Sequence, residues 1–180
     1  FWKPSRRKFE LDSITLNHAR PVAVFVDEKP EQVLATANRF GIQCLQFHGK
    51  ESPEYCREFK DKGFEIIKMV RMGNQVDWNE LQPYLPYVNY FLFDTAGKLP
   101  GGNGSIFNWE LLKDYPFKVP YILSGGLGVE NVEEIIAFAN TEEYCAMLDF
   151  NSKLEDKPGI KNLSKVKQVL KKLREIHVDN

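Results

Sequence analysis

The chain has 180 residues, of which 43% are hydrophobic, 13% aromatic and 27% charged. This size and composition fit one globular domain with a sizeable core, spanning residues 1–180. The 24 basic and 25 acidic residues leave a formal charge of −1, so charge does not favour nucleic acid or an anionic membrane as a partner. No apolar run reaches the roughly 18–20 residues of a bilayer span, and we find no signal peptide.

The three cysteines, Cys44, Cys56 and Cys145, show no CxxC or paired-histidine spacing. Their odd number and spacing argue against a disulfide scaffold and a structural zinc site, so we expect no bound metal and a cytoplasmic location. The sequence opens on Phe1 rather than on methionine, and we therefore expect it to start within a longer gene product.

Short apolar runs alternate with helical segments along the chain. The predicted strands are Val22–Val26, Cys44–Phe47, Ile66–Val70, Tyr90–Phe93, Pro120–Leu123 and Cys145–Phe150. The predicted helices are Lys29–Phe40, Ser52–Lys62, Asp77–Leu85, Phe107–Lys113, Glu130–Ala139 and Leu163–Leu173. In the last helix we expect one buried apolar stripe, made of Leu163, Val166, Leu170 and Leu173.

This alternation predicts a parallel α/β sheet, either doubly wound or closed into a barrel. Polar residues follow the strand ends, namely His48, Arg71, Asp94, Ser124 and Asp149. Polar groups at every strand end are typical of a (β/α)8 TIM barrel, whereas a doubly wound sheet concentrates them at one switch point. We therefore predict an incomplete (β/α)8 barrel with six full strands plus the end of the second at Phe1-Trp2, and we expect that it does not close by itself.

Side-chain alternation places several of these polar groups on one face of the sheet. Gln46 shares a strand face with His48, and we predict that both point inward with Asp94 and Asp149 to line one mouth. From the pattern alone, His48 could equally be a packing residue and Asp94 a helix-capping residue.

Two segments near the end of the chain suggest a phosphate site. Gly125 and Gly126 lie in a turn from a strand into a helix, where backbone amides can hold a phosphate. Asn151 and Ser152 can start a short extra helix that faces the same anion. Tight turns without a ligand are the alternative. A further glycine-rich loop, Thr95–Ile106, is long enough to form a lid.

Five segments together resemble the phosphoribosylanthranilate isomerase family of tryptophan biosynthesis. They are VAVFVDE (22–28), LQFHG (45–49), FDTAGKLPGGNG (93–104), SGGLGVENV (124–132) and LDFNSKLEDKPGIKN (148–162). The resemblance implies the Amadori rearrangement of N-(5′-phosphoribosyl)anthranilate to 1-(2-carboxyphenylamino)-1-deoxyribulose 5-phosphate. It also implies a small phosphorylated substrate, no metal and no organic cofactor.

The resemblance also implies roles for individual residues. Asp94 matches the family's general acid, and Asp149 is the expected neighbour that would raise its pKa. Arg7 matches the arginine that holds the anthranilate end, with Arg6 as a rival one position away, and His48 matches the family's active-site histidine.

Two departures bear on the mechanism. The family's general base is a cysteine in a KICG-type motif, which this sequence does not contain. Cys44, Cys56 and Cys145 fit buried apolar positions better, so we expect the base upstream or an inactive polypeptide. Lys153 stands where the family usually has glycine, and it either contacts the phosphate or points to solvent.

Two alternatives remain open at this point. One is another phosphosugar barrel enzyme, such as an indole-glycerol-phosphate synthase relative, for which Lys68 is the available strand lysine. The other is a non-catalytic phosphate-binding fragment that needs upstream strands. In each case we expect a monomer or a homodimer, with no nucleic acid and no membrane partner.

Overall fold

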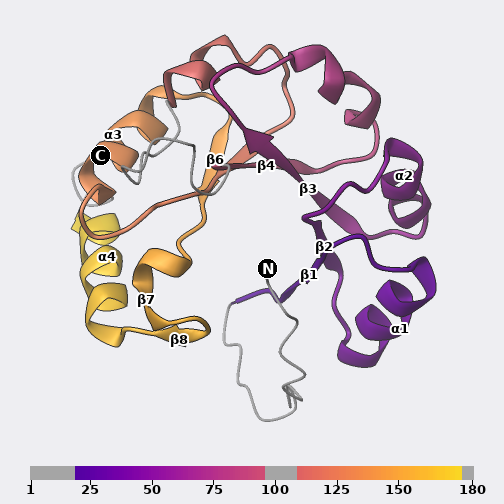
Figure 1. Cartoon of the computed structure of the whole chain (residues 1–180), viewed down its shortest axis with the longest axis horizontal. Helices are drawn as coiled ribbons and strands as arrows, with labels where there is room; N and C mark the ends of the chain where they lie inside the picture. Colours follow the sequence, from indigo (N-terminus) through magenta and orange to yellow (C-terminus); the bar gives the residue numbers. More distant parts are fainter. Residues whose placement is uncertain (1–18, 96–108, 176–180) are drawn as a thin grey trace.

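The computed structural model of the chain describes residues 19–95 and 109–175. Six strands form one parallel sheet in the order β1-β2-β3-β4-β5-β6, so strands that follow one another in sequence are also neighbours in the sheet. The sheet curves into an open ring, with the helices on its outer side (Figure 1). The strands are β1 (Val22–Phe25), β2 (Cys44–Phe47), β3 (Glu65–Met72), β4 (Tyr90–Thr95), β5 (Tyr121–Leu123) and β6 (Cys145–Leu148).

The helical segments follow the strands as the sequence predicts, with shifts of a few residues at their ends. The α-helices are α1 (Pro30–Phe40), α2 (Pro53–Asp61), α3 (Val132–Thr141) and α4 (Leu163–Glu175). The 3₁₀ segments are η2 (Trp78–Tyr84), η3 (Trp109–Asp114) and η4 (Ser152–Leu154). A hairpin of β7 (Glu155–Lys157) and β8 (Ile160–Lys161), which the sequence analysis did not predict, separates η4 from α4.

Local chemistry explains where α1 and α2 begin and end. The Ser52 side chain caps α2 by accepting a hydrogen bond from the Tyr55 amide at 3.2 Å, and Pro53 occupies the first helical position. Gly41 ends α1 with a φ of 62°, in the left-handed region that glycine adopts without steric cost. These signals are local in sequence, which is why the predicted bounds are close to the observed ones.

The expected stripe on α4 is wrong in part. Leu163 and Leu170 are exposed, at 71% and 45%, whereas Val169 is buried. Val169 packs in a cluster with Val132, Ile136 and Leu154, and Val166 and Leu173 lie partly buried against it. The helix therefore turns its 166–169–173 face inward, because that face meets α3 and η4.

The sheet separates two apolar layers. The larger core lies between the outer face of the sheet and the helices and contains Phe47, Phe59, Ile66, Met72 and Phe93. A smaller cluster lies on the inner face and contains only strand residues, namely Cys44, Ile67, Met69, Leu92 and Ile122. This division fixes which residues of each strand point toward the interior of the ring.

In the described part of the chain, β1 and β6 are the edges of the sheet and do not pair with each other. The inner-face residues of the β1 segment are exposed, with Val22 at 42%, Val24 at 54% and Val26 at 52%. The expectation that the chain does not close a barrel by itself is therefore confirmed for the described residues.

Several predicted features lie outside the described residues. They are Phe1-Trp2, Arg6, Arg7 and most of the loop 95–106. Among the helices that are described, none is both long and apolar enough to cross a membrane.

Candidate active site

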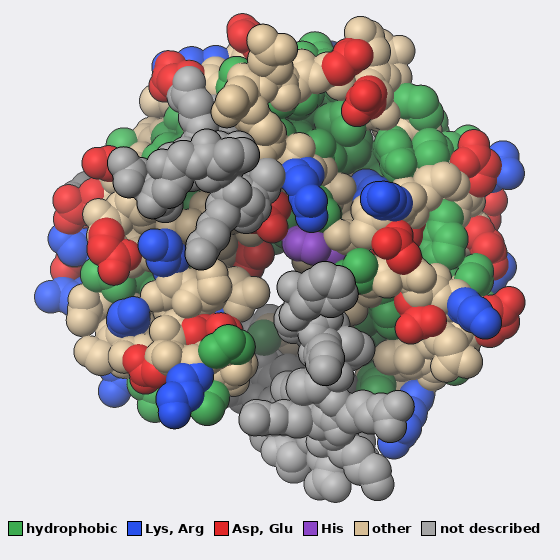
Figure 2. Space-filling model, viewed as in Figure 1, with side chains coloured by type: hydrophobic (Ala, Val, Ile, Leu, Met, Phe, Trp, Pro, Cys, Tyr) green, Lys and Arg blue, Asp and Glu red, His purple; other side chains and the backbone are tan. Residues whose placement is uncertain are grey.

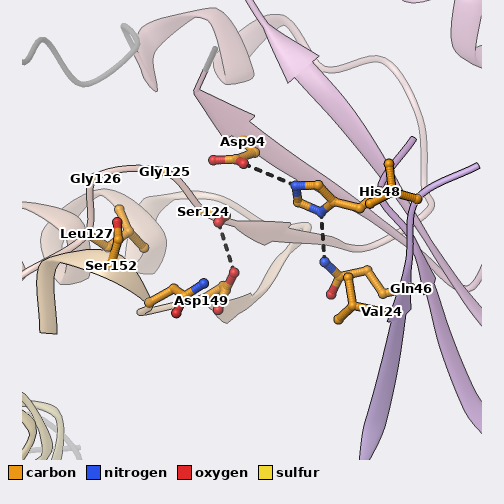
Figure 3. A pocket seen from close by; sticks show the side chains of 12 residues that line it. Val24, Gln46, His48, Asp94, Ser124, Gly125, Gly126, Leu127, Asp149 and Ser152 are labelled. Atoms are coloured by element: carbon orange, nitrogen blue, oxygen red, sulfur yellow. Dashed lines mark hydrogen bonds and ion pairs between the residues drawn. The ribbon is translucent and has the colours of Figure 1, made fainter. Parts of the chain in front are cut away.

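The predicted mouth exists at the carboxyl ends of the strands. Gln46, His48, Asp94 and Asp149 all line one cavity of about 510 Å³, so the structure brings these four residues together. Figure 2 shows a central opening with a histidine side chain at its rim, and Figure 3 shows the labelled side chains around the cavity. Gln46 and His48 have the parity of inner-face Cys44, and Asp94 has the parity of inner-face Leu92. Asp149 directly follows β6 and lines the same cavity.

His48 and Asp94 form the central pair of this site. The distance from His48 Nε2 to the nearer Asp94 carboxylate oxygen, Oδ2, is 3.5 Å, and both side chains are about a third exposed, at 31% and 28%. His48 directly follows β2 and Asp94 lies in β4, so they meet across the end of β3, which lies between these strands. Figure 3 shows the two side chains facing each other. Asp94 thus lies in the cavity rather than capping a helix.

Gln46 orients the His48 ring from the strand below it. Its Nε2 lies 2.9 Å from His48 Nδ1. Because an amide NH₂ only donates, Nδ1 accepts in this arrangement, and the ring proton of neutral His48 is on Nε2, facing Asp94. The tautomer of His48 thus depends on the orientation of the Gln46 amide, since the amide oxygen in the same place would favour a proton on Nδ1.

Asp149 has a different partner from the one expected. Its Oδ2 accepts a hydrogen bond from Ser124 Oγ at 2.9 Å, whereas the ion pair of Asp94 is with His48. Asp149 therefore lines the same cavity as Asp94 but is hydrogen-bonded to Ser124 at the end of β5. Ser124 also lines the cavity, and the sequence analysis listed it only as a polar residue at a strand end.

The glycine turn after β5 has the backbone geometry that the phosphate prediction requires. Gly125 and Gly126 have φ values of 86° and 72°, which a side chain would strain. Within the described ranges, no backbone hydrogen bond occupies the amide of either glycine. Both residues line the cavity, so these amides are available to an anion there.

Asn131 holds this turn in shape, and the sequence analysis assigned it no role. Its Oδ1 accepts from the Gly128 amide at 2.9 Å, and its Nδ2 donates to the Gly126 carbonyl at 3.1 Å. These two bonds explain why α3 starts at Val132 and not at the predicted Glu130. An asparagine a few residues after a glycine pair is the available signal for such a clamp.

The segment after β6 forms the other side of the predicted phosphate site. Asn151 and Ser152 line the cavity, and the short helix predicted there is present as η4. Lys161 fixes this segment by donating to the Asn151 carbonyl at 3.0 Å and to its side-chain oxygen at 2.6 Å. The β7–β8 hairpin, which was not predicted, therefore holds Asn151 in place through Lys161.

Lys153 is exposed, and its side-chain stem lies against the glycine turn. A Cβ built on Gly128 would approach Lys153 Cβ to 2.9 Å, so the two loops touch at this point. The absence of a side chain at Gly128 thus leaves room for the Lys153 side chain, which stands where the family usually has glycine.

A second, buried ion pair lies behind the mouth. Lys68 Nζ lies 3.1 Å from Glu51 Oε2, with side chains only 6% and 1% exposed. Lys68 also donates to the Phe47 and Gly49 carbonyls, at 3.4 and 2.7 Å. Lys68 therefore faces the helices and not the cavity, which removes the lysine that the synthase alternative needs.

None of the three cysteines provides a general base at the mouth. Cys44 and Cys56 are buried and Cys145 is partly buried, and none of them lines the cavity. Burial raises the pKa of Cys44 to about 11, that of Cys56 to about 12 and that of Cys145 to about 11. Their thiolates are therefore scarce at neutral pH.

The sheet is parallel and curved, and at its carboxyl ends it presents an imidazole–carboxylate pair beside a glycine turn. This arrangement defines a class, the (β/α)8-type enzymes. Known proteins narrow that class to one family. The family model described as N-(5'phosphoribosyl)anthranilate (PRA) isomerase matches residues 3–172. The chain belongs to the phosphoribosylanthranilate isomerase family.

Individual relatives agree with this assignment. The N-(5'-phosphoribosyl)anthranilate isomerase of a Thermoanaerobacter species is 38% identical over 179 residues, covering 96% of this chain and 84% of the relative. That of Phocaeicola vulgatus is 36% identical, covering 86% and 74%. The crystal structure of the Thermus thermophilus enzyme matches with a TM-score of 0.69 and 29% identity, covering 86% of this chain and 72% of that one.

Proposed function

We propose that the chain catalyses the Amadori rearrangement of N-(5′-phosphoribosyl)anthranilate with Asp94 as the general acid. One observation chiefly supports this: the Asp94 carboxylate shares a single cavity with Gly125, Gly126, Asn151 and Ser152. A phosphosugar held by its phosphate at these residues would present its furanose ring toward Asp94. The reaction needs only proton transfers, and among the described residues there is no cluster of three metal-ligating side chains.

In the first step Asp94 gives its proton to the ribose ring oxygen, and the ring opens to a Schiff base. His48 assists by directing its Nε2 proton toward one Asp94 oxygen, which leaves the other oxygen free to carry the transferred proton. Gln46 keeps His48 in that tautomer. Asp149, held by Ser124, lines the same cavity and contacts the bound sugar.

In the second step a base removes the C2′ proton, and the enolamine then tautomerises to the ketone. We propose that this base comes from outside the 180 residues, because Cys44, Cys56 and Cys145 do not line the cavity and have raised pKa values. The family resemblance points to a cysteine on an upstream strand. Arg7 is proposed to hold the anthranilate end.

Turnover of phosphoribosylanthranilate tests both parts of this proposal. We expect conversion when the chain is supplied with a polypeptide carrying the family's first strands and their cysteine, and no measurable conversion when that cysteine is replaced by alanine. Binding without turnover in both mixtures would favour the non-catalytic phosphate-binding fragment instead. No binding in either would contradict the proposed function altogether.

We further propose a single barrel domain and a cytoplasmic location, supported by three free thiols. A Thermotoga maritima structure that matches with a TM-score of 0.66 and 28% identity is of monomers generated from a dimeric phosphoribosylanthranilate isomerase. Light scattering on the purified chain would distinguish the monomer from the homodimer.

A further inference from the structure

We propose that Lys161 is a positioning residue, which fixes the side-chain amide of Asn151 so that its NH₂ group is directed to the substrate's phosphate. This inference rests on the proposed function and deepens it, since it concerns how one residue of the phosphate site is oriented. Lys161 lies on β8, and neither the family resemblance nor the mechanism above gives it a role in the reaction.

Lys161 contacts Asn151 at two atoms. Its Nζ lies 3.0 Å from the Asn151 backbone oxygen and 2.6 Å from the side-chain oxygen, Oδ1. The third partner of the same ammonium is Glu155 Oε1, at 2.8 Å. An ammonium has three protons to donate, so these three oxygens use its whole capacity. Lys161 is not among the residues that line the cavity, and no donor of its side chain remains for a bound phosphate.

The contact with Lys161 decides which end of the Asn151 amide faces the ammonium. A lysine ammonium only donates hydrogen bonds, so the atom that it meets has to be the amide oxygen and not the amide nitrogen. The two ends of an asparagine amide have nearly the same shape, so shape alone does not choose between them. With Oδ1 held by Lys161, the Nδ2 group is directed away from Lys161.

The Nδ2 group of Asn151 is available to a ligand. Within residues 19–95 and 109–175 it donates no hydrogen bond, whereas both oxygens of Asn151 are bound by Lys161. Asn151 lines the cavity together with Ser152, Gly125 and Gly126. A phosphate carries acceptor oxygens, so its site needs donors. Nδ2 adds two N–H donors to the site, whereas a reversed amide would place its oxygen against the anion.

Glu155 keeps Lys161 in place for this contact. The two residues pair across the β7–β8 ladder, which brings their side chains together. The hydrogen bond from Lys161 lowers the pKa of Glu155, so this carboxyl is ionised at neutral pH. The ammonium is thus held between an ionised carboxylate on one side and the two oxygens of Asn151 on the other.

A double-mutant cycle tests whether Lys161 acts through Asn151. We would titrate the chain with 1-(2-carboxyphenylamino)-1-deoxyribulose 5-phosphate and with its dephosphorylated form. Asn151→Ala and Lys161→Met should each weaken binding of the phosphorylated product by about 10- to 100-fold, since a hydrogen bond to a charged group is lost. In the Asn151→Ala background, Lys161→Met should change that binding by less than about twofold. Binding of the dephosphorylated form should stay within about twofold in every variant.

Lys165→Met is the matched control. Lys165 donates to the Lys153 carbonyl at 3.2 Å, so its ammonium holds the same segment without contacting Asn151. We expect this variant to bind both ligands as the unsubstituted chain does. The side chain of Lys161 is 40% exposed, so Lys161→Met should fold normally, which its unfolding transition checks.

An effect of Lys161→Met that persists in the Asn151→Ala background would overturn the proposal, because it would come from the lysine charge or from a displaced segment. The same conclusion would follow if Lys165→Met weakened binding equally, or if both ligands were affected alike. Inorganic phosphate, used as a second probe, separates this inference from the proposed function. Coupling of Lys161 to Asn151 in phosphate binding, without turnover of phosphoribosylanthranilate, would support the inference and contradict the isomerisation. Phosphate and product binding that neither substitution changes would overturn the inference, while turnover would still test the isomerisation.

Discussion

Two ion pairs lie on opposite faces of the same sheet, and their surroundings differ sharply. Lys68 and Glu51 meet behind β2 and β3 with side chains 6% and 1% exposed, whereas His48 and Asp94 meet in the cavity with about a third of each side chain exposed. The buried pair is enclosed by further bonds, because Glu51 also accepts from the Asp27 and Gly49 amides at 2.9 Å. The pair in the cavity keeps hydrogen-bonding capacity for a ligand.

We call Lys68–Glu51 the rear pair and His48–Asp94 the front pair. The rear pair stabilises the backbone segment that carries His48 of the front pair. Lys68 donates to the carbonyls of Phe47 and Gly49, the residues on either side of His48. Gly49 is itself required there, since a Cβ at that position would come within 2.4 Å of the Asp27 side chain. The backbone around His48 is thus fixed by the buried Lys68–Glu51 pair, while the His48 imidazole lies in the cavity and can contact a ligand.

The largest effect is expected from breaking the front pair. Asp94→Asn keeps the shape of the side chain but removes its acidity, so kcat should fall by about 10³- to 10⁴-fold in the polypeptide mixture that turns over. Product binding and the unfolding transition should change little. Near-normal kcat in this variant would show that the acid is another residue.

Breaking the rear pair should act on stability instead. Lys68→Met leaves the Glu51 carboxylate buried without its cation, which should lower the free energy of unfolding by about 3–5 kcal/mol in urea titrations. Lys62→Met is the matched control, because Lys62 pairs with Glu58 at 3.6 Å with both side chains about two-fifths exposed. Such a surface pair should contribute less than about 0.5 kcal/mol. Equal effects of the two substitutions would contradict the structural role of Lys68.

The contrast between the pairs also explains what could be predicted from the sequence. The alternation of strands and helices, the helix ends at Ser52 and Gly41, and the shared face of Gln46 and His48 follow from periodicity and local signals. The convergence of these two residues with Asp94 and Asp149 in one cavity needed the structure. The partners of those residues do not follow from local signals either, because a pairing such as Asp149 with Ser124 depends on the register between strands far apart in the chain.

The same limit applies to the supporting residues. Glu51 and Lys68 are charged residues that a sequence reading assigns to the surface or to catalysis, and only the packing of α2 on β3 shows them as a buried pair. The buried face of α4 was predicted wrongly for the same reason. Val169 is buried because it packs against α3 and η4, which the periodicity of α4 alone does not show.

A smaller effect is expected from alkaline pH, which tests the burial of the cysteines. The folded-state pKa of Cys44 is raised to about 11 from an ordinary value of 9.0, so the folded protein holds this proton when the unfolded chain has lost it. The contribution of Cys44 to the free energy of unfolding is complete below about pH 9 and decreases as the pH rises toward 11. At about pH 10.5 the loss is about 2 kcal/mol.

Thermal unfolding at about pH 8 and about pH 10.5 measures this loss. Burial also raises the pKa values of Tyr115 and Tyr121, which act in the same direction, so Cys44→Ala is needed as the comparison. We expect that variant to lose less stability between the two pH values than the unsubstituted chain. An unchanged difference would mean that the Cys44 thiol is as accessible to ionisation folded as unfolded.

The mildest change concerns the orientation of His48 within the front pair. Gln46→Leu removes the bond to Nδ1 and leaves the Lys68–Glu51 pair intact, so we expect kcat/KM to fall by about fivefold, close to 1 kcal/mol, with the unfolding transition nearly unchanged. Gln46→Glu sharpens the test, because a carboxylate accepts from Nδ1 and favours the other tautomer or the imidazolium. If Gln46 acts by placing the proton on Nε2, the glutamate variant should lose more activity than the leucine variant, and its pH profile should shift. If it acts only by filling space, glutamate should be tolerated better than leucine, since it is nearly the same shape as glutamine.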